Sequence, residues 1–181
     1  MLTVVSNIKT RIADRWDDLG RINQVLIAFS GFFVLATMLS GYFFVKQAHD
    51  IRNLKCLAMN VYHEARSEPE SGQYAVAVVT MNRVDSSRYP QDVCKVVYQK
   101  SWSEKLQRYI SAFSWTTDGK ENIPYESDAW KKSFQVASEV YYDDIPHKVK
   151  DALFYHADYV KPRWARNKVK ITKIGRHIFY K

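Results

Sequence analysis

Several residue types are scarce in this chain, and their scarcity excludes whole classes of protein. Among 181 residues there are two Cys, six Gly and five Pro. Two thiols are too few for a disulfide-scaffolded miniprotein or a four-thiolate zinc site, but enough for one bridge. So little Gly and Pro excludes a collagen-like or low-complexity chain. With 46% hydrophobic residues, the chain is also too apolar to be disordered.

Acidic residues are also fewer than basic residues. The 27 Lys and Arg residues outnumber the 19 Asp and Glu residues, which leaves a net charge of +8. Most of this excess lies after residue 45. A basic chain of this kind favours an anionic partner, which can be nucleic acid, anionic lipid or an acidic polymer.

One long apolar run contains no charged residue. Residues 25–45 read VLIAFSGFFVLATMLSGYFFV, which as a helix would be about 32 Å long. This length matches a bilayer core of about 30 Å, whereas a buried core helix or the apolar region of a cleaved signal peptide is usually shorter. We therefore predict a short cytoplasmic segment over 1–21, an uncleaved transmembrane signal anchor over 22–46, and one compact domain over 47–181.

The charges that flank the apolar run predict its orientation. Four cations precede the run and three follow it closely: Lys9, Arg11, Arg15 and Arg21, then Lys46, Arg52 and Lys55. The positive-inside rule then favours a single pass through the inner membrane, with the N terminus in the cytoplasm and the domain in the periplasm or extracytoplasmic space. Small residues such as Gly31 and Gly41 within the run suit either helix pairing or an anchor weak enough to leave the bilayer.

The pattern after the anchor predicts helices first and strands last. Apolar spacing and helix-end signals predict helices over 50–67, 71–84, 92–98 and 127–142, and strands within 152–157 and 168–181. Asp50 and Ser127 are the expected caps of the first and fourth helices, and Pro69 ends the first. The second helix is apolar on every side and should be buried. This order predicts an α+β domain, mainly helical with a small C-terminal antiparallel sheet.

Within the fourth predicted helix, four apolar residues fall on one face. They should point inward, and they are Trp130, Phe134, Ala137 and Tyr141.

Glu64 is the most informative single residue. It continues the row formed by Leu54, Leu57 and Val61, which is the core-facing stripe of the first predicted helix. A carboxyl group held against apolar surface has a raised pKa, which suits a general acid near neutral pH. The alternative is a structural carboxylate paired with Arg66 or Arg83.

The histidines and one buried amide allow structural as well as functional readings. His63 and Glu64 begin an HExxH zinc motif, but position 67 is Ser, so that motif is rejected. His156 and His177 lie among aromatic residues, where a lone His is more often structural. Asn82 falls at a buried position, where it would orient substrate or hold a loop.

Aromatic residues are frequent after the anchor. They would stack on bases or sugars, or form core, and they are Tyr98, Trp102, Trp115, Tyr155, Tyr159, Trp164 and Tyr180. Nucleic acid is disfavoured by the anchor and by the lack of a recognisable nucleic-acid motif. Cys56 and Cys94 would pair if the domain lies outside the cytoplasm and would remain buried thiols if it lies in the cytosol.

Six segments together resemble the SleB/CwlJ-type cell wall hydrolases, a family known from spore-cortex-lytic enzymes and found also in other bacteria and in phages. The segments are CLAMNVYHEARSEPESGQYAVAVVTMNRV (56–84), YPQDVCKVVYQ (89–99), FSW (113–115), DG (118–119), ALFYHADYVKPRWA (152–165) and KIGRHIFYK (173–181). The resemblance covers nearly everything after Leu54. Two departures are Ser67, where Gly is common, and extra sequence over 101–111.

This resemblance implies a lysozyme-like domain that cuts peptidoglycan glycan strands, in wall degradation or host lysis. The catalytic glutamate of the family falls on Glu64. Residues at motif positions that would line or support the cleft are Gln73, Asn82, Trp115, Tyr155, His156, Trp164 and His177. The expected partners are peptidoglycan and the membrane, without nucleic acid, cofactor or metal.

The expected chemistry is cleavage between N-acetylmuramic acid and N-acetylglucosamine by a lytic transglycosylase. Glu64 would protonate the glycosidic oxygen, and no obvious second carboxylate accompanies it. The fallback candidates are Glu68 and Asp118. Two alternatives remain at this point: a zinc-dependent N-acetylmuramoyl-L-alanine amidase with ligands from His63, His156 and His177, and a non-catalytic wall-binding anchor.

Overall fold

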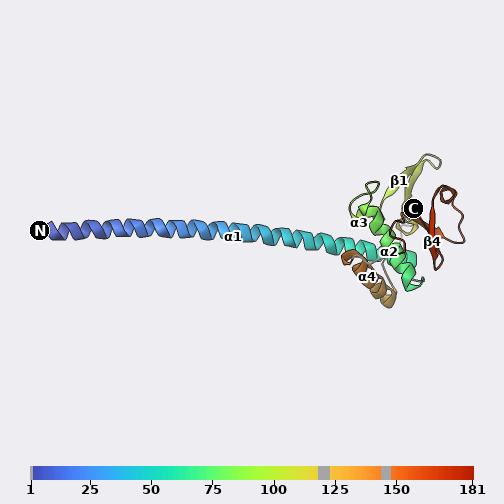
Figure 1. Cartoon of the computed structure of the whole chain (residues 1–181), viewed down its shortest axis with the longest axis horizontal. Coiled ribbons are helices and arrows are strands. Elements are labelled where there is room, and N and C mark those ends of the chain that lie inside the picture. The colour runs from blue at the N-terminus through green and yellow to red at the C-terminus, as the bar shows by residue number, and fades with distance from the viewer. Residues whose placement is uncertain (1, 118–122, 144–147) are drawn as a thin grey trace. The chain divides into compact units, whose positions relative to one another are not determined.

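The computed structural model describes residues 2–117, 123–143 and 148–181, and it divides the chain into two units. The first unit covers Met1–Ala48 and the second covers His49–Lys181. Helix α1 (Leu2–Ala65) begins in the first unit and ends in the second (Figure 1). Each unit is described in turn below.

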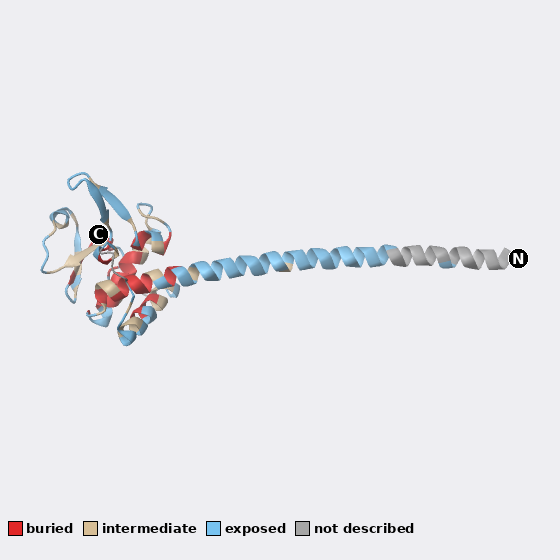
Figure 2. Ribbon diagram, turned by 180° about the vertical axis from the view of Figure 1, so that it is seen from behind, coloured by how far each residue is buried: buried red, intermediate tan, exposed pale blue. Residues whose placement is uncertain are grey.

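In the first unit, the apolar side chains of α1 along residues 22–45 are exposed around the helix. Phe33, Met38 and Phe44 are 69%, 68% and 74% exposed, and nothing in the described chain covers their neighbours along 25–45 either (Figure 2). A helix that is apolar all round requires an apolar environment. By length and composition, the part of α1 from Gly20 onward could cross a membrane, as the sequence predicts.

The predicted helix start at Asp50 is wrong, because α1 passes through this position without interruption. No Gly or Pro occurs between Gly41 and Pro69, so the chain lacks a residue that would break the helix there. The Asp50 carboxylate does not cap a helix. It accepts a hydrogen bond from the Tyr141 hydroxyl at 3.0 Å.

Helix α2 (Glu70–Asp85) is the buried centre of the second unit, as predicted. Ala77 belongs to one apolar cluster, shared with Leu57 and Val61 of α1. Val79 belongs to a second cluster, shared with Phe179. Core on two sides explains why this helix lacks a polar face along 75–79.

The other two helices, α3 (Val93–Val97) and α4 (Ser127–Tyr142), contact α2 and match their predicted ranges closely. Ser127 is the first residue of α4 and not its cap. The backbone N–H groups of Tyr125 and Glu126 donate instead to the Tyr62 hydroxyl, at 3.3 and 3.2 Å. Phe134, expected inward, is 37% exposed, while Ala137 is buried.

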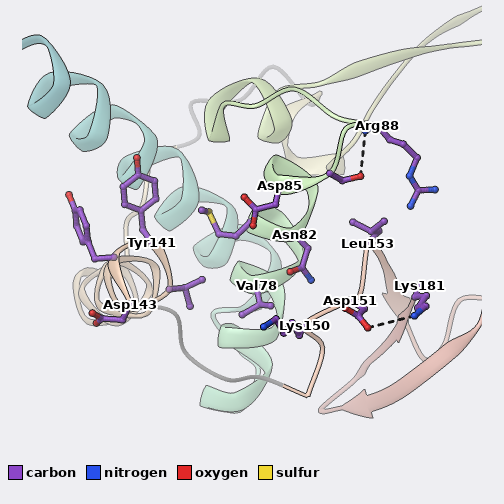
Figure 3. A pocket seen from close by; sticks show the side chains of 14 residues that line it. Val78, Asn82, Asp85, Arg88, Tyr141, Asp143, Lys150, Asp151, Leu153 and Lys181 are labelled. Atoms are coloured by element: carbon purple, nitrogen blue, oxygen red, sulfur yellow. Dashed lines mark hydrogen bonds and ion pairs between the residues drawn. The ribbon is translucent and has the colours of Figure 1, made fainter.

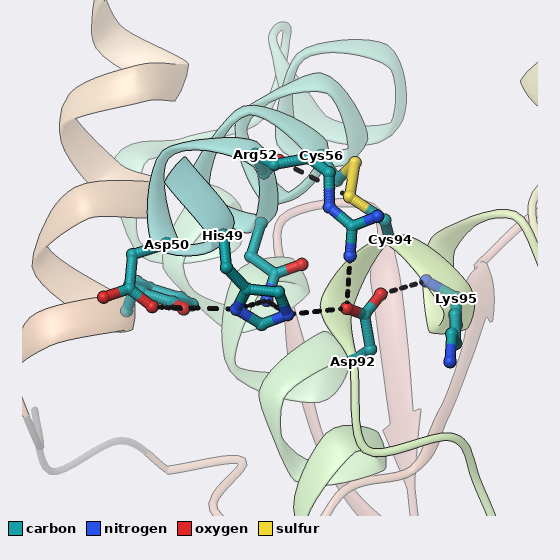
Figure 4. A network of polar contacts seen from close by, with 9 residues as sticks. His49, Asp50, Arg52, Cys56, Asp92, Cys94 and Lys95 are labelled. Carbon is teal, nitrogen blue, oxygen red and sulfur yellow. Dashed lines mark hydrogen bonds and ion pairs between the residues drawn. A yellow bond between two sulfur atoms is a disulfide. The ribbon is translucent and has the colours of Figure 1, made fainter. Parts of the chain in front are cut away.

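A network of polar contacts and one disulfide hold α3 against α1 (Figure 4). Cys56 and Cys94 form the disulfide, with 5.2 Å between their Cα atoms. Asp92 caps α3 by accepting from the Lys95 backbone N–H at 2.8 Å. The Asp92 carboxylate also accepts from Arg52 at 2.6 Å and lies 3.1 Å from His49 Nε2.

The C-terminal sheet has three antiparallel strands in the order β3-β5-β4. These are β3 (Phe154–Ala157), β4 (Lys170–Ile174) and β5 (His177–Tyr180), which confirms the predicted strand regions. A short 3-10 helix, η2 (Arg163–Asn167), lies between β3 and β4. The β4–β5 turn uses Gly175 at a φ of +55°, a conformation that favours Gly.

An additional hairpin was not predicted. Strands β1 (Lys100–Ser103) and β2 (Arg108–Ser111) pair as an antiparallel two-stranded sheet over the extra sequence at 101–111. A second 3-10 helix, η1 (Ser114–Thr116), follows it.

Candidate active site

Glu64 lies in the last turn of α1 and is partly buried. The hydroxyl of Tyr155, on β3, donates a hydrogen bond to Glu64 Oε2 at 3.1 Å. Burial raises the pKa of Glu64, whereas this hydrogen bond and the positive charge of Arg83 lower it by less. The pKa of Glu64 therefore lies above its ordinary value, so the carboxyl group keeps its proton to a higher pH than an exposed glutamate does.

The two partners of Glu64 are themselves fixed by contacts. The Tyr155 ring packs against His177 and Phe179, with centroids 5.1 and 5.7 Å away. Burial and the neighbouring Glu64 raise the pKa of Tyr155 well above its ordinary value, so its hydroxyl remains a donor. Arg83 donates through Nε to the Leu153 carbonyl at 2.9 Å, which holds the cation beside the start of β3.

A buried chain of hydrogen bonds beginning at Asn60 of α1 positions Trp115, on which His63 stacks. Trp115 Nε1 donates to Asn60 Oδ1 at 3.1 Å, and Asn60 Nδ2 donates to the Thr80 hydroxyl at 3.1 Å. The His63 ring stacks on Trp115 with centroids 4.4 Å apart. Sequence reasoning missed Asn60, although its place four residues before Glu64 puts it on the same helix face.

His156 lies on the opposite face of the sheet from Tyr155, because neighbouring strand residues alternate between faces, and Trp164 of η2 packs against His156. His156 Nε2 is 2.9 Å from the Tyr180 hydroxyl, and its Nδ1 is 2.8 Å from the Ala157 carbonyl oxygen. Trp164 packs edge-on to His156 with centroids 5.5 Å apart and is 37% exposed. These residues form a second cluster, apart from the Glu64–Tyr155 pair.

The buried Glu68 carboxylate forms an ion pair with the exposed Arg176 of the β4–β5 turn. Its carboxylate accepts from the Arg176 backbone N–H and from Nε, both at 2.8 Å. Burial raises the pKa of Glu68, but these hydrogen bonds outweigh burial, and the pKa lies below its ordinary value. A Cβ at Gly175 would lie 2.1 Å from Glu68 Oε2, so this close approach also requires Gly. Glu68 is therefore ionised, and both of its carboxylate oxygens are bonded to the β4–β5 turn.

Gln73 and His177 are buried close to this ion pair. Gln73 Nε2 donates to the Glu68 carbonyl at 3.2 Å. Burial lowers the pKa of His177, so the imidazole is neutral near pH 7. Within the described residues, Gln73 Oε1 and His177 Nδ1 are buried without a hydrogen-bond partner.

Asn82 holds a loop. Its Nδ2 donates to the carbonyls of Val149 and Ala152, both at 2.9 Å. It also borders a pocket between the C-terminal end of α2 and the end of α4, together with Asp85, Tyr141 and Lys181 (Figure 3). Glu64 does not line this pocket.

The proposed zinc ligands do not come together in the described part of the chain. Over 2–117, 123–143 and 148–181, no group of three or more His, Cys, Asp or Glu side chains is placed to hold a metal ion. His63 stacks on Trp115 while His156 is bonded to Tyr180 on another face. The fallback carboxylate Asp118 lies outside the described residues.

Comparison with known proteins agrees with this fold. Spore cortex-lytic enzymes of Oceanobacillus iheyensis and Bacillus subtilis are 31% and 30% identical to this chain over 140 and 130 residues. These matches cover 76% and 70% of this chain but 44% and 37% of the two relatives, so the chain spans less than half of their length.

A solved structure is similar over nearly its whole length. It is the catalytic domain of the germination-specific lytic transglycosylase SleB from Bacillus anthracis, 31% identical with a TM-score of 0.53. The similarity covers 71% of this chain and 93% of that domain. The family described as Cell Wall Hydrolase matches residues 67–180, a range that begins three residues after Glu64. The chain therefore belongs to the cell wall hydrolase family.

Proposed function

We propose that this protein is a membrane-anchored lytic transglycosylase of peptidoglycan, with Glu64 as its general acid and then its base. The observation that carries the proposal is the Glu64 carboxyl group, which is partly buried, accepts a hydrogen bond from Tyr155 and has a raised pKa. The activity named for the Bacillus anthracis domain is the same chemistry.

Glu64 would donate its proton to the glycosidic oxygen between N-acetylmuramic acid and N-acetylglucosamine. The bond to the muramic C1 then breaks, and positive charge develops there. The Glu64 carboxylate next takes the proton of the muramic 6-hydroxyl, whose oxygen attacks C1. The product is a 1,6-anhydro sugar, and Glu64 ends in its starting protonation state.

The surroundings of Glu64 favour a mechanism with one carboxylate. A glycosidase with two carboxylates needs a second free acid or base close to the scissile bond. Glu68 is engaged by Arg176 through two hydrogen bonds and cannot turn to substrate without breaking both. A transglycosylase needs no second carboxylate, because the substrate's own hydroxyl is the nucleophile.

The other motif residues would act around this centre. Tyr155 would orient Glu64, while Trp115 would hold the His63 ring through stacking. Gln73 and His177 offer buried acceptor atoms beside the Glu68 turn. Trp164 and His156 would offer an aromatic surface to the glycan on the other sheet face, and Asn82 would support the loop near 149–152.

The apolar part of α1 would hold the enzyme in the inner membrane. We assign the span to 22–46, with 1–21 in the cytoplasm and 47–181 on the side of the cell wall. The excess of cations before the span supports this orientation. A disulfide between Cys56 and Cys94 is also typical of a compartment outside the cytoplasm.

Product analysis tests the reaction. The full chain in detergent micelles is incubated with purified sacculi, and the released fragments are identified by mass spectrometry. We expect anhydro-muropeptides. New reducing ends would indicate a hydrolase, and freed stem peptides would indicate an amidase. An absence of fragments would indicate a wall-binding protein without activity.

A further inference from the structure

The β1–β2 hairpin presents two large rings to solvent. Trp102 and Tyr109 are directly opposite in the antiparallel register, so their side chains lie on the same face. Their ring centroids are 5.2 Å apart in an edge-on arrangement. The two rings remain 47% and 64% exposed, and Figure 2 shows the hairpin as exposed.

A series of ring contacts leads from the end of α1 to the base of this hairpin. His63, next to Glu64, stacks on Trp115, and Trp115 in turn meets Tyr98 edge-on at 5.7 Å. Tyr98 is 47% exposed and lies two residues before β1. The hairpin is closed at its base by a hydrogen bond from the Ala112 N–H to the Gln99 carbonyl at 2.8 Å. The hairpin that carries the exposed rings is thus joined at its base to the ring series that begins beside Glu64.

We propose that the Trp102–Tyr109 face of the hairpin is an accessory binding site for the peptidoglycan glycan strand, outside the bond that is cut. This proposal rests on the proposed function and extends its substrate contacts. Exposed aromatic faces suit sugar rings, whose C–H groups are apolar. The stem peptides of the wall polymer carry carboxylates.

The charge of the hairpin matches such a polymer. Lys100 lies on the same face as the two rings, Lys105 lies in the turn and Arg108 lies on the other face, against the single acid Glu104. The tip from Glu104 to Gln107 has one apolar residue, Leu106. Insertion into a bilayer would require a contiguous apolar tip, so the hairpin favours a glycan over a lipid surface.

Binding to purified sacculi tests this site, using the full chain in detergent micelles with Glu64→Gln in every variant to prevent cleavage. Trp102→Val with Tyr109→Thr removes both rings while keeping residues that favour strands. We expect the affinity to fall about tenfold. Trp102→Phe with Tyr109→Phe keeps two rings and should bind within about threefold of the parent.

Ile110→Ala is the matched control, because Ile110 is an exposed apolar residue on the other face of the hairpin. It should leave affinity unchanged. The proposal is overturned if the ring-removing variant binds as the parent does, or if the control or the Phe variant loses as much affinity. Failure of the proposed function is a separate result: the parent chain, with Glu64 intact, would then release no anhydro-muropeptides, while the hairpin variants would still differ in binding.

Discussion

At the scale of single residues, the hydrogen bond between Tyr155 and Glu64 influences the pH range over which the proposed acid is protonated. Burial raises the pKa of Glu64, and the Tyr155 hydroxyl opposes this by stabilising the ionised form. The Tyr155 hydroxyl therefore makes the rise in the pKa of Glu64 smaller, and it also orients the carboxyl group. Tyr155 acts as a positioning residue in this account.

Tyr155→Phe separates these two effects. Loss of the hydrogen bond removes an interaction that favours the charged carboxylate, so the pKa of Glu64 should rise further. Because activity requires protonated Glu64, the fall in activity on the alkaline side should move to higher pH, while the maximal rate decreases by about tenfold or less. The measurement is the initial rate of sacculus solubilisation across pH.

Tyr142→Phe serves as the control for this prediction, since Tyr142 is exposed on α4. Its pH profile should match that of the parent. The role given to the Tyr155 hydroxyl would be contradicted if the activity of Tyr155→Phe fell at the same alkaline pH as that of the parent, or at a lower pH.

Residues of the site differed in how far the sequence could predict them. Glu64 stood out because a carboxylate in an apolar helical row is visible from spacing alone. Its contacts to Tyr155 and Arg83 join residues 91 and 19 positions away and depend on tertiary packing. The sequence does not single out Asn60, because its role depends on hydrogen bonds with Trp115 and Thr80, which are distant in sequence.

At the scale of elements, the attachment of α3 to α1 depends on one covalent bond and one charged cap. Cys56 and Cys94 are 38 positions apart, and the carboxylate of Asp92 receives hydrogen bonds from both helices. A crosslink of this kind restricts the unfolded chain more than it changes the folded one.

Replacing both cysteines with Ser should lower the free energy of unfolding of the second unit by about 4 kcal/mol in the chain-entropy model. Denaturation of the full chain in detergent, followed by tryptophan fluorescence, measures this. Reductant should destabilise the parent to the level of the double variant and leave the variant unchanged. Equal stability of parent and variant without reductant would show that the bond contributes little.

Two elements could not be predicted from sequence, for different physical reasons. The helix start expected at Asp50 is absent. A residue type that favours helix caps need not start a new helix when it lies inside an uninterrupted helical segment. The β1–β2 hairpin lacks a buried face, so its residues show no clear alternation of apolar and polar types. Its turn places Gln107 at a φ of 47°, where Gly or Asn would have given a recognisable signal.

At the scale of the whole molecule, composition already separated a long apolar segment from a basic domain. The apolar residues of 25–45 remain exposed in the first unit, while α2 accounts for the other long apolar stretch by being buried. The positive charge that remains after residue 45 suits the proposed action on an anionic wall.

The anchor is tested by placing charge in it. Leu35→Arg with Met38→Arg should release the chain from membranes on alkaline extraction, because each Arg at the centre of a span costs about 2.5–3.5 kcal/mol. Ile51→Arg, outside the assigned span and exposed, should remain in the membrane pellet as the parent does. A parent chain that is itself extracted would contradict a transmembrane anchor.

The most direct test of the central claim is the rate of glycan cleavage by Glu64→Gln. Gln keeps the size of the side chain but cannot donate the proton, so release of anhydro-muropeptides from sacculi should fall by about 100-fold or more. Glu70→Gln, a matched change at an exposed residue paired with Lys132, should retain the parent rate. Full activity in Glu64→Gln, with both variants folded, would contradict the assignment of Glu64 as the catalytic acid.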